Sequence, residues 1–194
     1  MPKLLTFVSF VFLLLACRKT YTSSFEKSFP GFYKVTKITS SVPVDLNNDR
    51  IKTANIYAEI SDPHKTHNGE LVSFHDFQQQ NNYLEVRPLP DQLNASKLIS
   101  FNFPHQIIDY FSNNTPYLVE YNNEFLIYTY KFNNDRTVEI ASSNPDYTNQ
   151  LGVINSLIVK ANGVLVVQLK KQIFDFFDHS WKQIDLTAEY SKMP

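Results

Sequence analysis

The most regular pattern in the chain is a strict alternation of apolar and polar residues near its C-terminal end. From Lys182 to Tyr190 this alternation continues without an error. One set consists of Ile184, Leu186, Ala188 and Tyr190, and the other of Gln183, Asp185, Thr187 and Glu189. Because successive side chains of a strand point to opposite faces of a sheet, this pattern predicts a half-buried β-strand with the first set facing the core.

Short β-branched and aromatic runs fill most of the chain after residue 30, and asparagines separate them. The chain has only four Gly, so Asn is the next residue that tolerates turn conformations. Asn162-Gly163 lies between two such runs, 154–160 and 164–172, and predicts a β-hairpin. Asn122-Asn123 predicts a second turn, which would join strands at 117–121 and 124–132.

Two segments carry a helical pattern. Thr53 to Ile60 predicts one short helix, and Pro104 to Phe111 a second, because Pro suits the first helical turn and the apolar residues that follow share a face. No internal repeat of fixed period is present. Eight to ten sequential strands therefore predict a mainly β fold, an antiparallel up-and-down β-barrel with one or two short helices. A sandwich of two sheets is the alternative.

The first residues read as a targeting segment. Leu4 to Leu15 carry no charge, but they are too few to span a bilayer as a helix and have the length of a secretory apolar region. This run ends in Leu14-Leu15-Ala16-Cys17, which resembles the lipobox of bacterial lipoproteins. The resemblance implies that residues 1–16 are a signal peptide and that the Cys17 thiol carries a diacylglyceryl group. A buried apolar helix with a core cysteine is the alternative, although a core helix would show a polar face.

The lipobox resemblance also implies a location. Residues 17–29 would be the lipidated N-terminus and a tether, because this stretch is polar and rich in Ser and Thr. Surface-exported lipoproteins of some Gram-negative groups carry acidic residues just after the lipidated Cys, whereas here the first acid is Glu26. The resemblance therefore favours a lipid anchor in the outer membrane, with the protein facing the periplasm.

Residues 30–194 would form the folded domain, and its layout resembles a second family. Gly31-Phe32-Tyr33-Lys34-Val35 opens the first strand, Val42 to Asp49 reads VPVDLNND before a short helix, and the last strands contain Trp181 and Tyr190. This order resembles the lipocalin-like lipoproteins of Gram-negative bacteria. The resemblance implies a lipocalin-like β-barrel, with a small apolar ligand held in the barrel.

Composition excludes several other classes of protein. Lys and Arg total 18 against 19 Asp and Glu, so the chain has no basic surface to favour nucleic acid. A single Cys permits neither an intrachain disulfide nor a cysteine zinc cluster. The chain has no Gly-x-Ser-x-Gly motif and no Gly-rich phosphate loop, so we do not expect an enzyme.

One loop is a candidate metal site. Asp45, Asn47 and Asp49 place side-chain oxygens at alternate positions, as in the first half of a calcium-binding loop. The EF-hand pattern then requires Gly and a later Glu, but here those positions hold Arg50 and Ile56, and Glu59 follows three residues late. Calcium is therefore one interpretation, and an Asx-type turn before a helix is the other. No other cofactor is expected.

Three histidines and an aromatic cluster complete the candidates. His64, His67 and His75 supply zinc-type ligands, but they lie in a loop-like stretch, which favours solvated histidines. Phe174, Phe176 and Phe177 beside Trp181 form the densest aromatic cluster, in a turn between the last two strands.

The leading function is binding of a small apolar ligand in the barrel. The alternative is a non-enzymatic envelope protein with a packed barrel that binds a protein partner through its aromatic face.

Overall fold

The computed structural model describes residues 24–61, 65–67, 70–74, 83–88, 96–114, 116–133, 136–141 and 152–194. Two short helices and ten strands are present in this part of the chain. They are α2 Ser24–Ser28, β1 Gly31–Ser40, α3 Ile56–Glu59, β2 Lys65–His67, β3 Glu70–Phe74, β4 Tyr83–Val86, β5 Leu98–Tyr110, β6 Pro116–Phe132, β7 Val138–Ala141, β8 Val153–Val159, β9 Leu165–Asp175 and β10 Ser180–Lys192. The predicted signal peptide and Cys17 lie outside the described residues.

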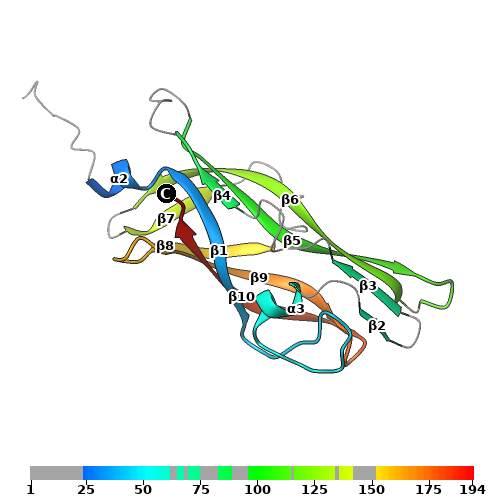
Figure 1. Ribbon diagram of the computed structural model, residues 1–194. Coiled ribbons are helices and arrows are strands. Elements are labelled where there is room, and N and C mark those ends of the chain that lie inside the picture. Colours follow the sequence, from blue (N-terminus) through cyan, green and yellow to red (C-terminus); the bar gives the residue numbers. More distant parts are fainter. Residues whose placement is uncertain are drawn as a thin grey trace, which may run out of the picture.

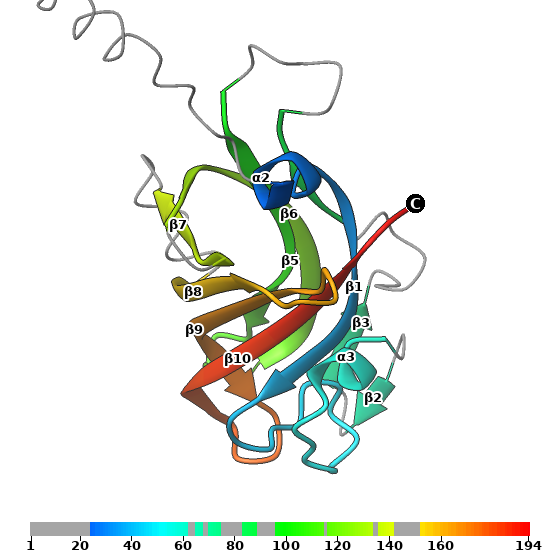
Figure 2. The same cartoon turned by 90° about the vertical axis from the view of Figure 1, so that its left-hand side faces the viewer.

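Eight of these strands form a nearly closed antiparallel barrel (Figure 1, Figure 2). Strands β4 to β10 follow one another in chain order, and β1 lies between β10 and β4. Between the described residues of β7 and β8 the seam is joined by one bridge, Thr137 to Ile158. This arrangement confirms the predicted mainly β up-and-down barrel and excludes the two-sheet sandwich.

The β2–β3 hairpin is an addition to the barrel. Strand β3 pairs in parallel with β6, from Leu71 opposite Leu118 to Phe74 opposite Tyr121. Figure 1 shows this hairpin beside the end of the barrel where β5 ends and β6 begins. Every other pairing between described strands is antiparallel.

The predicted β-hairpin at Asn162-Gly163 and the predicted last strand are confirmed. Strands β8 and β9 form the hairpin, and the amide of Gly163 donates to the Lys160 carbonyl at 2.9 Å within its turn. In β10 the four predicted core residues are at most 2% exposed. Their polar neighbours Gln183 and Asp185 are exposed, so the predicted register of this strand is correct.

The predicted helix over 104–111 is wrong, because this segment belongs to β5. Strand β5 pairs with β6 through its whole length, with Pro104 opposite Asn123 and Ile108 opposite Val119. On its other side, β5 pairs with β4 at Ile99 and Ser100, and no described strand pairs with it at Pro104. Proline is tolerated where no partner strand needs its N–H group, so it does not end β5. The long-range pairing therefore overrides the local helical pattern.

The predicted turn at Asn122-Asn123 is also wrong. Strand β6 runs from Pro116 to Phe132 without a break, and His105 of β5 lies opposite Asn122. Continuous pairing with β5 satisfies backbone groups on that side of the segment, so the turn preference of asparagine has no effect here. Strand β6 continues to Phe132, which lies opposite Val138 of β7, so the chain turns between these two residues.

Two segments cover the ends of the barrel. At one end α2 lies over the opening (Figure 2), and Phe29, which follows α2, is 1% exposed. At the other end Val44, Leu46, Ile56 and Ile60 are buried between residues 41–55, α3 and the β9–β10 turn. Helix α3 confirms the predicted helix in a shortened form, and Asn55 caps it by accepting from the Ala58 amide at 3.3 Å.

The interior of the barrel is filled by large side chains. Tyr33, Tyr190, Phe101, Ile99 and Leu84 are each at most 2% exposed and belong to one apolar cluster. The rings of Phe101 and Tyr128 meet edge to face at 5.6 Å. Packing of this kind is typical of small barrels, whose interior is just wide enough for side chains.

Candidate functional site

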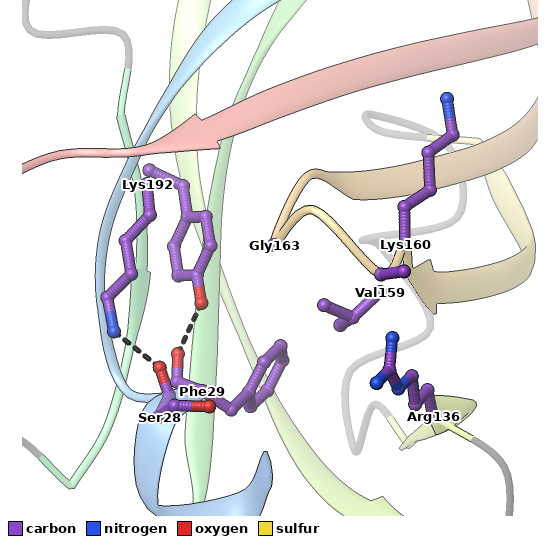
Figure 3. A pocket seen from close by; sticks show the side chains of 9 residues that line it. Ser28, Phe29, Arg136, Val159, Lys160, Gly163 and Lys192 are labelled. Atoms are coloured by element: carbon purple, nitrogen blue, oxygen red, sulfur yellow. Dashed lines mark hydrogen bonds between the residues drawn. The ribbon is translucent and has the colours of Figure 1, made fainter.

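A pocket of about 470 Å³ lies at the mouth of the barrel, between α2, the ends of β1 and β10, and the β8–β9 turn. We call it the mouth pocket. Figure 3 shows its walls: Phe29 lies between Lys192 on one side and Val159 and Arg136 on the other. The residues that line it are Ser28, Phe29, Tyr33, Arg136, Val159, Lys160, Ala161, Gly163 and Lys192.

The apolar wall of the mouth pocket is fixed by packing behind it. The Phe29 ring lies edge to face against Tyr130 at 5.4 Å and Phe132 at 5.1 Å. The Tyr33 hydroxyl donates to the Phe29 carbonyl at 2.5 Å, and burial raises the pKa of Tyr33 to about 12. Tyr33 therefore stays a neutral donor and holds the chain between α2 and β1 in place.

Gly31 allows a lysine to pass close to the mouth. Its φ is 144°, and a Cβ on Gly31 would lie 2.8 Å from Cε of Lys192. The Lys192 ammonium donates to the Ser28 carbonyl and lies 5.9 Å from the centre of the Tyr33 ring. Partial burial lowers the pKa of Lys192 because the charged form loses hydration. The glycine predicted to open the first strand thus has a packing role.

Two more cations border the mouth pocket. Lys160 forms an ion pair with Glu189 at 3.3 Å, and in Figure 3 its side chain extends away from the Phe29 ring. Arg136 adopts a positive φ of 64° just before the Thr137–Ile158 bridge, and its side chain points toward Val159 in Figure 3. No described residue accepts a hydrogen bond from the Arg136 guanidinium or forms an ion pair with it.

The loop predicted as a metal site is compact. The Asp49 amide donates to Oδ1 of Asp45 at 3.2 Å and to Oδ1 of Asn47 at 3.0 Å. The Arg50 amide donates to Oδ2 of Asp45 at 3.0 Å. Arg50 has a φ of 67°, a conformation that glycine adopts most easily. The three predicted side chains therefore converge, and backbone amides occupy several of their oxygens.

Glu59 joins this loop, although EF-hand spacing places it three residues too late. Its carboxylate lies with those of Asp45 and Asp49 in a group whose oxygens are within 4.8 Å of one another. Helix α3 carries Glu59 back toward the loop, where it accepts from the Leu46 amide at 3.0 Å. The arrangement offers oxygen ligands of the kind that calcium prefers. The helix predicted at 53–60 was the sequence signal that could have brought Glu59 into the set.

Burial controls the ionisation of this group. Asp45 and Glu59 are 0% and 5% exposed. Desolvation raises the pKa of Glu59 to about 7, with a further contribution from the neighbouring charges of Asp49 and Asp45. Desolvation also raises the pKa of Asp45. A cation in the loop would oppose both shifts, because it favours the charged carboxylates.

The folded protein without calcium should lose stability as the pH rises through this range. The ordinary pKa of Glu is 4.5, so between about pH 4.5 and 7 the folded chain binds more protons at Glu59 than the unfolded chain does. The free energy of unfolding should therefore fall by up to about 3 kcal/mol across that window, and Asp45 adds to the slope at lower pH. Urea titrations at several pH values measure this fall. Glu59→Gln should remove most of it, and an unchanged slope in that variant would contradict the assignment.

Calcium binding by this loop stays a prediction. With Arg50 in the glycine position we expect a Kd no better than about 10⁻⁴–10⁻³ M, which gives about 1.4 kcal/mol of stabilisation at tenfold saturation. Thermal melts with and without millimolar calcium measure the shift. An increase in Tm that disappears in Asp45→Ala and in Glu59→Gln supports the site, whereas no shift at about 10 mM calcium leaves only a turn.

The aromatic cluster forms the predicted turn between β9 and β10. Phe174 contacts Phe176 and Trp181, with ring centres 5.3 and 5.8 Å apart. Phe174 and Phe176 are buried, whereas Phe177 and Trp181 are about half exposed. The Trp181 indole donates to the Tyr110 hydroxyl at 3.3 Å. The cluster is therefore partly core and partly surface.

Asp175, in the middle of that cluster, is a buried carboxylate that sequence reasoning did not single out. It is 0% exposed, and its Oδ1 accepts from the amides of Asp45 at 3.2 Å and Phe177 at 3.0 Å. Its Oδ2 accepts from the Lys182 ammonium at 2.6 Å. Asp175 thus fastens the 45–50 loop to the β9–β10 turn. No local pattern marks a contact between residues so far apart in sequence.

The histidines add no site. His64 and His75 lie outside the described residues, and His67 lies in β2, where only the backbone is described. The group of Asp45, Asp49 and Glu59 is the one set of potential metal ligands found within the described residues. In that part of the chain no helix is long and apolar enough to cross a membrane.

Comparison with known proteins gives no relative. Searches against family models, curated proteins and solved structures found no match. The description of this chain therefore rests on its own architecture, a nearly closed antiparallel barrel of eight strands with a pocket at its mouth.

Proposed function

We propose that this protein is a lipid-anchored, lipocalin-like lipoprotein that binds a small apolar ligand in the mouth pocket and has no catalytic activity. The observation that carries the proposal is the pocket itself. Its volume of about 470 Å³ lies in the range of small-molecule sites, and its wall holds Phe29, Tyr33 and Val159. The aromatic side chains packed inside the barrel would give the ligand a rigid floor.

The ligand would lie at the mouth and not deep in the barrel. Tyr190, Phe101 and Ile99 are buried in the barrel interior and do not line the pocket, which lies at α2 and the β8–β9 turn. This place differs from the central site that the family resemblance implies. Each CH₂ group removed from water at the mouth would contribute about 0.8 kcal/mol to binding.

A bulky residue on the β8–β9 turn tests the proposal. Ala161 lines the mouth pocket and is exposed, so Ala161→Trp should fill the pocket with little change to the core. Binding of an apolar fluorescent probe such as 1-aminoanthracene should then fall at least tenfold. Ile158→Trp is the matched control, because Ile158 lies on the same hairpin, is 39% exposed and does not line the pocket. Equal affinities in both variants would contradict the proposed site.

The lipid anchor and its location in the outer membrane, facing the periplasm, belong to the same proposal. Ser24 at the start of α2 is seven residues after Cys17. A chain of that length spans at most about 25 Å, so an acylated Cys17 would hold the α2 end of the barrel close to the bilayer. The mouth pocket lies at that end. A ligand could thus be taken from, or delivered to, the membrane surface.

Cys17→Ser tests the anchor. Two or more acyl chains give stable membrane attachment, so the variant should remain unprocessed or be released from membranes. Labelling with radioactive palmitate measures the modification directly. Equal incorporation of label by Cys17→Ser would show that the lipid is attached elsewhere and would contradict the assignment of Cys17.

A protein partner is the second candidate, and one exposed cluster favours it. Trp181, Tyr110 and Phe111 are 49%, 41% and 55% exposed, and the first two are joined by a hydrogen bond. Aromatic residues of this kind are enriched at protein interfaces. Co-purification of an envelope protein that depends on Trp181, together with an empty mouth pocket, would favour this function over ligand binding.

A further inference from the structure

We infer that the ligand of the mouth pocket is an anionic amphiphile, whose negatively charged head group is bound by Arg136 while its apolar part lies against Phe29 and Val159. This inference rests on the proposed function and specifies the class of ligand. It would also distinguish the site from a pocket that selects ligands by apolar surface alone.

The charges of the described residues that line the pocket are unbalanced. Among these residues Arg136, Lys160 and Lys192 are cations, and none is acidic. Lys160 is compensated by Glu189 on β10. Lys192 donates to a neutral carbonyl, and its partly buried ammonium has lost some of its hydration. The pocket therefore presents net positive charge beside an apolar wall, which complements a molecule with one anionic end.

Arg136 is the cation placed to contact the head group. No hydrogen bond or ion pair joins its guanidinium to the part of the chain that the structure describes. The Thr137–Ile158 bridge fixes the adjacent backbone across from Val159, and the side chain points toward that residue (Figure 3). Guanidinium binds carboxylate and phosphate groups through two parallel hydrogen bonds, so an unpaired Arg at the rim suits either head group.

The apolar groups lie within the same pocket. Phe29 is held by Tyr130 and Phe132 behind it, so its ring is rigid. Val159 precedes Lys160 on the opposite wall. Phe29 and Val159 are 1% and 6% exposed without a ligand. A ligand that reaches Arg136 with its head group would pass the edges of these two side chains with its apolar chain.

The test compares four ligands that share a dodecyl chain. Dodecanoate and dodecyl phosphate are anionic, dodecanol is neutral, and dodecyltrimethylammonium is cationic. Their affinities for the full-length protein are measured by calorimetry below micelle-forming concentrations. Arg136→Gln is the test variant. Lys160→Gln is the matched control, because Lys160 already has a partner in Glu189 and extends away from the Phe29 ring.

Both anions should bind the wild-type protein at least tenfold more tightly than dodecanol, and the cation should bind least. Arg136→Gln should weaken the anions at least tenfold, with dodecanol unchanged and with a smaller effect of Lys160→Gln. The tighter of the two anions identifies the head group. Equal binding of anions and dodecanol, or an unchanged anion affinity in Arg136→Gln, would overturn the inference while the proposed pocket stands. Binding of none of the four would overturn both.

Discussion

Leu186→Ala is expected to lower the free energy of unfolding by about 2–5 kcal/mol, the range for a leucine removed from a packed core. Leu186 lies in the middle of β10 and is 1% exposed. It lies opposite Leu169 of β9 and Ser40 of β1, so its side chain is surrounded by paired strands that cannot collapse into the space it leaves. Urea titration monitored by circular dichroism measures the loss.

Thr187→Ala provides the control for that experiment. Thr187 is the next residue of the same strand, lies opposite Gln168 and Thr39, and is only partly buried on the outer face. Its replacement should cost well under the Leu186 value, as most surface changes do. Similar losses for the two variants would contradict the register of β10, because a shift by one residue exchanges the two faces of a strand.

Asp175→Ala should have an effect of similar size, about 3–5 kcal/mol, for a different reason. The Asp175 carboxylate is buried and accepts from the Asp45 and Phe177 amides and from the Lys182 ammonium. Alanine would leave buried donors without an acceptor and would remove one of the two carboxylates that pair with Lys182. The loss is measured as a fall in the midpoint of urea unfolding.

Asp178→Asn is the control for the Asp175 change. Asp178 lies three residues later and also pairs with Lys182 and with Lys52, which lower its pKa to about 2. Its side chain is partly open to solvent, so screening weakens these pairs. Asp178→Asn should therefore cost much less than Asp175→Ala. Equal costs would show that the ion pairs, and not the buried acceptor, connect the loop to the turn.

The strands that could be predicted were those with a complete local pattern. In β10 the alternation of Ile184, Leu186 and Ala188 with polar residues allows one register only. In the β8–β9 hairpin Asn162-Gly163 supplies a turn between two strand-forming runs. Both elements pair with neighbours in sequence, so local pattern and final structure agree.

Strands β5 and β6 could not be predicted correctly because their pairing decides their form. The apolar residues Ile107, Ile108 and Phe111 fit one helix face as well as they fit a strand. Asn122-Asn123 is a turn signal only where the chain has no partner strand. Continuous pairing of β5 with β6 overrides both local preferences.

The loop at residues 45–49 could be predicted from local spacing, whereas the mouth pocket could not. Asp45, Asn47 and Asp49 lie within five residues, and their spacing alone indicated that their side chains would converge. Glu59 and Asp175 reach this loop through α3 and the β9–β10 turn. The mouth pocket combines α2, β1, Arg136, the β8–β9 turn and Lys192. Residues so far apart in sequence carry no shared spacing, so only the closed barrel reveals the pocket.

Native mass spectrometry of the full-length protein purified from cells tests the central claim most directly. The account predicts a fraction of the protein with one small amphiphile bound, a fraction that is lost in Ala161→Trp and retained in Ile158→Trp. The ligand released on activation should be detected as an anion. Wild-type protein that carries no ligand, or a ligand retained equally by Ala161→Trp, would contradict binding in the mouth pocket.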